Sequence, residues 1–221
     1  MTVFREPDAL AAARLAAQQV ADAIAEALAT RGAAHLALSG GGTPRPAYEL
    51  LGSLVPDWRA VHVWFADERC VGPEDPESNA RLVRETLHAP GATVHRMRGE
   101  LGAQDGAAAY DRELGDVVLD VVLLGMGPDG HTASLFPHNP ALDVTGVRAV
   151  GVHDSPKPPP ERISLTRETL DGARRLVLLV AGADKAAALA AALGEPTPAT
   201  PMSLLERARL DVIADAAALP G

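Results

Sequence analysis

Apolar residues recur at every third or fourth position between residues 7 and 31, which is the spacing of one face of an α-helix. The other positions of this segment carry charged and amide side chains, which suit a face turned toward solvent. Gly32 follows, and glycine ends many helices because it tolerates the left-handed backbone conformation. We therefore predict one long helix over residues 7–31.

Beyond Gly32 the apolar residues form short, nearly continuous runs, which are typical of strands buried on both faces. The predicted strands cover residues 35–39, 61–66, 117–124, 146–152, 163–166, 175–181 and 210–214. Helical segments are predicted at residues 46–51, 78–88, 103–114 and 182–193. Strands and helices that alternate at this spacing predict an α/β fold with a mostly parallel sheet.

The length and composition limit the class of protein. Residues 1–221 contain only short proline-rich loops and no long linker, so we predict a single domain. The chain has 20 Lys and Arg against 29 Asp and Glu, and its net charge of −9 repels nucleic acid and anionic membranes. We find no signal peptide and no long apolar segment. We therefore expect a cytoplasmic protein with no nucleic-acid or membrane partner.

Ligands of open α/β sheets bind at the carboxyl ends of the strands, and polar segments follow several of the predicted strands. The first of these segments consists of Ser39, Gly40, Gly41, Gly42 and Thr43. Three glycines in a row leave backbone N–H groups unshielded ahead of a helix, which is an arrangement that binds phosphate. No Walker motif follows, and a plain tight turn is the alternative interpretation.

The second segment, Asp67, Glu68 and Arg69, follows the predicted strand at residues 61–66. A carboxylate at this place could position a substrate, and an arginine could bind an anionic group. A solvated loop or a local ion pair would have the same sequence, so both interpretations stay open.

The third segment covers residues 125–132 and matches the dinucleotide-binding pattern G-x-G-x-x-G. We reject a dinucleotide site, because a helix after Gly130 could extend only to Phe136 before a proline, which is too short for a crossover helix. The glycines instead predict a turn that presents Asp129 and His131 at the mouth of the sheet. A histidine there could exchange a proton near neutral pH, whereas a helix-capping histidine is the alternative.

The fourth segment covers residues 154–162, where prolines stiffen a loop that carries Lys157 and Arg162. Two cations on a rigid loop could face one anion, and a plain surface loop is the alternative. Cys70 is the only cysteine, which excludes an internal disulfide, and no histidine partner for it is evident. The histidines show no ligand spacing, so we predict no metal site.

Taken together, these segments resemble the 6-phosphogluconolactonase family. The matching motifs are Ser-Gly-Gly-x-Thr-Pro (39–44), Asp-Glu-Arg (67–69), Ser-Asn (78–79), Gly-x-Gly-x-Asp-Gly-His-Thr-Ala-Ser-Leu-Phe-Pro (125–137) and Lys-Pro-Pro-x-x-Arg (157–162). A strand-to-helix turn at residues 180–186 matches as well. The resemblance covers about residues 7–219 and weakens over residues 195–205, which are shorter than the family pattern.

The resemblance implies a single-domain, Rossmann-like three-layer fold shared with glucosamine-6-phosphate deaminase and ribose-5-phosphate isomerase. It implies hydrolysis of 6-phosphoglucono-δ-lactone to 6-phosphogluconate in the oxidative pentose phosphate pathway, without a cofactor. In this family the histidine that matches His131 is the proposed base, and either Asp129 or Asp67 would orient it or the substrate. The partner of the chain, a monomer or weak homo-oligomer, would be a small phosphorylated sugar lactone.

The phosphate of that substrate needs positive partners. Backbone N–H groups of the loop from Ser39 to Thr43 would hold it together with a cation. Arg69, Lys157 and Arg162 are the candidate cations, and the sequence leaves the choice among them open.

Two other functions stay open at this point. One is a sugar-phosphate isomerase or deaminase of the same fold, although the deaminases carry a tyrosine-containing motif where this chain has Asp67, Glu68 and Arg69. The other is a non-catalytic sugar-phosphate sensor, which would need an output module that we do not find in the sequence.

Overall fold

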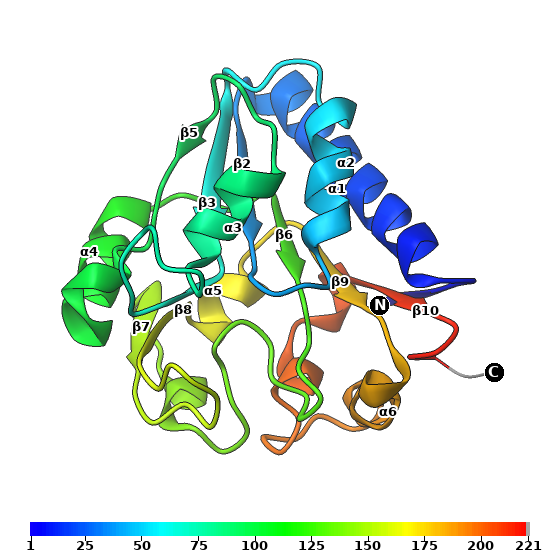
Figure 1. Cartoon of the computed structure of the whole chain (residues 1–221), viewed down its shortest axis with the longest axis vertical. Coiled ribbons are helices and arrows are strands. Elements are labelled where there is room, and N and C mark those ends of the chain that lie inside the picture. The colour runs from blue at the N-terminus through cyan, green and yellow to red at the C-terminus, as the bar shows by residue number, and fades with distance from the viewer. Residues whose placement is uncertain (220–221) are drawn as a thin grey trace.

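The computed structural model describes residues 1–219 and is built around a sheet of seven strands (Figure 1). Their order across the sheet is β1 (Thr2–Glu6), β10 (Leu210–Asp215), β9 (Leu176–Val180), β6 (Val121–Leu124), β2 (Ala34–Leu38), β3 (Val61–Phe65) and β5 (Thr93–Val94). Every adjacent pair is parallel. The prediction of an α/β fold with a mostly parallel sheet is therefore confirmed.

A second, antiparallel sheet contains β4 (Asp67–Arg69), β8 (Arg162–Leu165) and β7 (Ala149–Val152), in that order. The predicted strands at residues 146–152 and 163–166 thus exist, but they do not join the parallel sheet. Only a short loop without a helix connects β7 to β8, and a parallel pair would need a crossover of a dozen or more residues. Residues 67–69, for which a solvated loop was one of the open interpretations, form a strand of this sheet.

The described residues also form six α-helices and several short 3-10 turns. The helices are α1 (Ala9–Arg31), α2 (Arg45–Leu54), α3 (Asn79–Thr86), α4 (Ala103–Leu114), α5 (Arg167–Asp171) and α6 (Ala186–Leu193). The first helix starts two residues later than predicted, because the side chain of Asp8 caps it by accepting a hydrogen bond from the backbone of Ala11. Gly32 ends it with φ 77°, as predicted.

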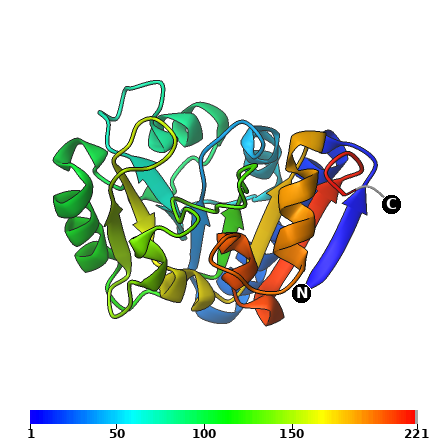
Figure 2. The same cartoon turned by 90° about the horizontal axis from the view of Figure 1, so that it is seen from below.

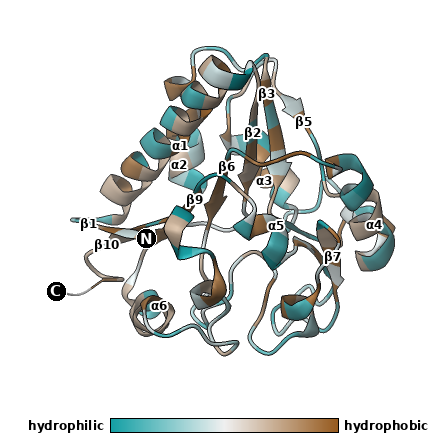
Figure 3. Ribbon diagram, turned by 180° about the vertical axis from the view of Figure 1, so that it is seen from behind, coloured by the Kyte–Doolittle hydropathy of each residue, from teal (hydrophilic) through white to brown (hydrophobic). Residues whose placement is uncertain are grey.

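Helix α1 packs across the sheet and contacts β1, β2, β6, β9 and β10. Its buried face consists largely of alanine, which lets the helix backbone approach the sheet closely. Figure 3 shows apolar strands in the interior and a mixed apolar and polar surface on α1. Seen from below in Figure 2, β1 and β10 lie at one end of the molecule and α4 at the other.

The chain reverses its direction of travel across the sheet between β2 and β6. From β2 it continues outward through β3 to β5, and it then returns to add β6, β9 and β10 on the other side. In open α/β sheets such a switch point opens a crevice at the carboxyl ends of the two strands. Among residues 1–219, no helix is both long and apolar enough to cross a membrane.

Candidate active site

The glycine segment lies where the sheet reverses, directly after β2. Gly41 has φ 101°, which is a conformation that glycine adopts without strain. The hydroxyl of Tyr48, on the first turns of α2, donates a hydrogen bond to the carbonyl of Ser39 at 2.5 Å and anchors the start of the loop. Gly40 packs so tightly against Asn79 that a Cβ atom would overlap that side chain. The loop is therefore held from both sides.

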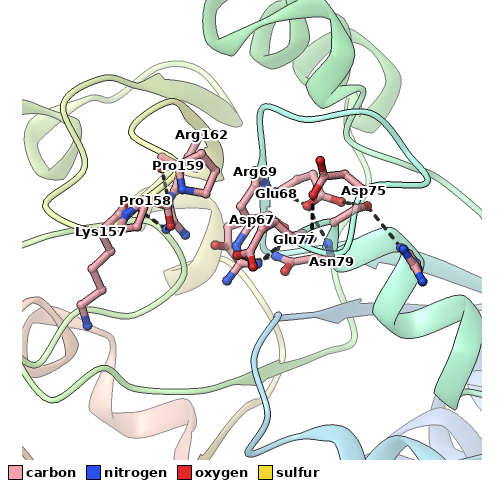
Figure 4. Close-up of polar contacts among 12 residues, drawn as sticks. Asp67, Glu68, Arg69, Asp75, Glu77, Asn79, Lys157, Pro158, Pro159 and Arg162 are labelled. Atoms are coloured by element: carbon pink, nitrogen blue, oxygen red, sulfur yellow. Dashed lines mark hydrogen bonds and ion pairs between the residues drawn. The ribbon is translucent and has the colours of Figure 1, made fainter.

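Strand β4 explains the three charged residues at 67–69. Side chains alternate between the two faces of a strand, so Asp67 and Arg69 share one face, and both line the pocket described below. Glu68 points the opposite way and is only 2% exposed. Its carboxylate accepts hydrogen bonds from the backbone N–H groups of Asn79 and Ala80 at the start of α3 (Figure 4). Glu68 is therefore an anchor for α3 instead of a solvated charge.

Each carboxylate oxygen of Asp67 accepts one hydrogen bond from a neighbouring side chain. Its Oδ2 accepts a hydrogen bond of 2.7 Å from Ser134 Oγ, and its Oδ1 accepts one of 3.2 Å from Asn79 Nδ2. Neither carboxylate oxygen of Asp67 makes a hydrogen bond to His131 within the described residues.

The turn after β6 brings Asp129 and His131 together. His131 Nδ1 lies 2.5 Å from Asp129 Oδ1, and the His131 side chain is 16% exposed. The turn is closed by a hydrogen bond from the backbone N–H of Gly127 to the carbonyl of His131. A Cβ atom on Gly127 would overlap the histidine ring, so the tight contact needs glycine at this position. No helix forms over residues 131–136.

Asp129 is ionised in this environment. Burial alone would raise its pKa, but the hydrogen bond and charge of His131, together with Lys157, hold the pKa of this carboxyl well below its usual range. Lys157 Nζ lies 3.6 Å from Asp129 Oδ1. The His131 ring also packs against Phe136, with ring centroids 4.6 Å apart. The two residues thus form a dyad with a cation beside its acidic end.

Arg162 is the first residue of β8 and is 5% exposed. It donates hydrogen bonds to the carbonyls of Lys157, Pro158 and Pro159, and its guanidinium lies 5.6 Å from the Phe136 ring centroid. Figure 4 shows Arg162 beside Pro158 and Pro159, with the Lys157 side chain extending away from Arg162. Burial lowers the pKa of Arg162. The proline loop is therefore held by Arg162, while Lys157 remains at the pocket wall.

These segments enclose one pocket of about 230 Å³ at the switch point. Its lining includes Ser39, Gly40, Gly41, Gly42, Thr43, Asp67, Arg69, His131, Lys157, Arg162 and Lys185. The structure thus gathers residues from all the segments singled out in the sequence. Asp129 touches two of the lining residues, His131 and Lys157.

Lys185 also lines the pocket, although it was not among the candidate cations expected from the sequence. It lies in the 3-10 turn after β9, and its side chain is 17% exposed. Two signals for it were present in the sequence. It follows a strongly apolar strand, and it belongs to the turn at residues 180–186 that resembles the family pattern.

No metal or thiol chemistry is suggested by the remaining side chains. Within residues 1–219, no three His, Cys, Asp or Glu side chains lie together in a way that could hold a metal ion. Burial, and then the charges of Glu161 and Glu68, raise the pKa of the Cys70 thiol to about 11. A thiol with this pKa remains protonated at neutral pH and is a poor nucleophile.

The chain is similar to known proteins in sequence and in fold. Residues 7–214 match the model of the family described as glucosamine-6-phosphate isomerases/6-phosphogluconolactonase. The chain is 40% identical over 215 residues to a 6-phosphogluconolactonase of Mycobacterium tuberculosis, covering 89% of this chain and 86% of that protein. The crystal structure of a 6-phosphogluconolactonase from Shewanella baltica superimposes with a TM-score of 0.90 at 30% identity, covering 98% of each chain.

A more distant structure shares the fold alone. A monomeric glucosamine-6-phosphate deaminase superimposes with a TM-score of 0.81 at 22% identity, covering 99% of this chain and 98% of the deaminase. The predicted likeness to the deaminase fold is therefore confirmed.

Proposed function

The chain belongs to the glucosamine-6-phosphate isomerase/6-phosphogluconolactonase family, and from that premise we propose that it is the enzyme that hydrolyses 6-phosphoglucono-δ-lactone to 6-phosphogluconate in the oxidative pentose phosphate pathway. The relatives named 6-phosphogluconolactonase support this substrate. The observation that carries the proposal is the 2.5 Å contact between His131 Nδ1 and Asp129 Oδ1 at a pocket lined by a glycine loop and cations. We also propose that the enzyme is cytoplasmic and acts as a monomer or weak homo-oligomer.

The dyad supplies the general base. An ionised carboxylate only accepts hydrogen bonds, so in the neutral ring of His131 Nδ1 carries the hydrogen and Nε2 carries the free electron pair. We assign the orienting role to Asp129, because the oxygens of Asp67 are engaged by Ser134 and Asn79. Asp67 remains at the pocket wall, where it can accept hydrogen bonds from sugar hydroxyls.

The reaction then needs one water and no cofactor. Nε2 of His131 takes a proton from water, and the oxygen of that water bonds to the lactone carbonyl carbon. The tetrahedral adduct collapses by breaking the bond between this carbon and the ring oxygen. Nε2 returns its proton to the ring oxygen, and the new carboxylic acid loses a proton to solvent. Such proton transfer contributes about 10²–10⁴ to the rate. Lys157, beside the dyad, would stabilise the negative charge of the adduct.

The phosphate would lie at the glycine loop. Its charge at neutral pH is about −1.5 to −2, and the backbone N–H groups between Gly40 and Thr43 are unshielded donors. Arg69 lines both this pocket and the neighbouring groove that contains Gly41 and Gly42, which favours it as a phosphate cation. Lys185, which also lines the pocket, is the second candidate for binding the phosphate. Arg162 is less suited to this role, because its guanidinium donates hydrogen bonds to the proline loop.

The proposal is tested with freshly prepared 6-phosphogluconolactone, whose hydrolysis is compared with the spontaneous rate. We expect His131→Gln to lower kcat by about 10²–10⁴, because the variant loses the base. His88→Gln changes an exposed histidine and serves as the matched control, with kcat unchanged. A kcat for His131→Gln within threefold of the wild type would rule out this base. Ammonia release from glucosamine 6-phosphate would instead favour a deaminase.

A further inference from the structure

The start of α3 joins two parts of the candidate site that lie on different strands. The Glu68 carboxylate accepts hydrogen bonds from the backbone N–H groups of Asn79 and Ala80 at 2.7 and 2.8 Å, and from Ser78 Oγ at 3.1 Å. An acidic side chain at this end of a helix also satisfies N–H groups that have no partner within the helix. The position of Asn79 relative to β4 is thereby fixed.

The side chain of Asn79 is 1% exposed and contacts the site on two sides. Its Nδ2 donates hydrogen bonds to the backbone carbonyl and to Oδ1 of Asp67, at 2.9 and 3.2 Å (Figure 4). Its Oδ1 faces Gly40, close enough that a Cβ atom on Gly40 would overlap it. Among the described residues, this buried Oδ1 has no hydrogen-bond partner, so its main contact is with the glycine loop.

We propose that Asn79 is a positioning residue that sets the glycine loop against Asp67, and that Gly40 is glycine because the Asn79 amide occupies the space of its side chain. The proposal rests on the function proposed above, since it assigns phosphate to this loop. It predicts that Asn79 acts on binding of the phosphorylated end of the ligand, with a smaller effect on proton transfer at His131.

The test is a double-mutant cycle on Gly40 and Asn79, read out by calorimetric binding of 6-phosphogluconate and by steady-state kinetics. We expect Gly40→Ala to weaken binding about tenfold or more, because the added methyl group pushes the loop away from the Asn79 amide. Asn79→Ala removes that amide, so the same Gly40→Ala change made on top of it should cost less than about twofold. In both single variants KM should rise more than kcat falls.

Val83→Ala, one turn further along α3, controls for loss of stability. Val83 is buried in the core and has no contact with the pocket, so its truncation should lower Tm and leave binding of 6-phosphogluconate unchanged. If Asn79→Ala does not fold, Asn79→Ser, which keeps a hydroxyl near Asp67, completes the cycle.

Independent, multiplicative losses of binding from the Gly40 and Asn79 changes would overturn the proposal, as would unchanged binding in Gly40→Ala. Binding of 6-phosphogluconate without lactone hydrolysis would contradict the proposed function alone.

Discussion

The contact between Asp129 and His131 gives a prediction at the scale of a single atom. Asn at position 129 keeps the shape of the side chain but can donate a hydrogen bond to Nδ1. The hydrogen of His131 then moves to Nε2, which removes the base without removing the ring. We expect Asp129→Asn to lower kcat by about 10²–10⁴ with little change in KM.

Steady-state kinetics with 6-phosphogluconolactone measure this effect. Asp154→Asn provides the matched control, because Asp154 is an exposed residue outside the dyad and should leave kcat unchanged. A large rise in KM with an unchanged kcat would show that Asp129 binds substrate instead of orienting the base.

At the scale of the elements, the sequence predicted the parallel sheet because each central strand is a continuous apolar run. The local turn at Asp129 and His131 was predictable for a similar reason, since its glycines and both functional groups are close together in the chain. The antiparallel sheet was not, because β4 consists only of charged residues and resembles a loop. Glu68 is buried because its carboxylate binds the backbone at the start of α3, and no local sequence pattern predicts that contact. Strand β1 was missed because its mostly exposed residues at a sheet edge lack a periodic signal.

Strands β2 and β3, with the residue after β5, also bring together a histidine cluster that does not line the pocket. His62 Nδ1 lies 3.0 Å from His95 Nε2, and His95 Nδ1 lies 2.8 Å from Glu113. Trp64 donates a hydrogen bond of 3.1 Å to Nδ1 of His35, whose ring stacks on His62. The contact between His62 and His95 and the hydrogen bond from Trp64 to His35 each need one unprotonated ring nitrogen as the acceptor. Burial and then the neighbouring histidines lower the pKa values of His35 and His62.

These lowered pKa values predict a loss of stability in mild acid. Below about pH 6.5 the histidines of the unfolded chain bind protons, whereas His35 and His62 of the folded protein bind them only at lower pH. The free energy of unfolding therefore falls as pH falls through this range. The slope is at most about 1.4 kcal/mol per pH unit for each proton. Thermal unfolding between pH 8 and pH 5.5 measures it.

His62→Phe keeps an aromatic ring at the centre of the cluster and removes one titrating group, so we expect a shallower dependence of Tm on pH. His153→Gln, which changes an exposed histidine, should retain the wild-type slope. Equal slopes in the wild type and in His62→Phe would show that the cluster does not cause the acid sensitivity.

At the scale of the whole molecule, a net charge of −9 opposes the approach of an anionic sugar phosphate. The cations that line the pocket must therefore act locally. Arg45 is an additional exposed cation at the start of α2, in a groove that shares Gly41, Gly42 and Arg69 with the pocket. Because Arg45 lines the neighbouring groove and not the pocket itself, we expect it to guide the phosphate toward the glycine loop without taking part in the reaction.

Arg45→Glu should then lower kcat/KM about tenfold at about 0.01 M salt, with kcat unchanged, because electrostatic guidance acts on the association step. The loss should nearly vanish at about 1 M salt, where charges are screened within about 3 Å. Arg112→Glu makes the same change in net charge on α4, away from the pocket, and should have a much smaller effect at low salt. A salt-independent loss in Arg45→Glu would mean that Arg45 contacts the bound phosphate directly, and equal losses in both variants would mean that only the total charge matters.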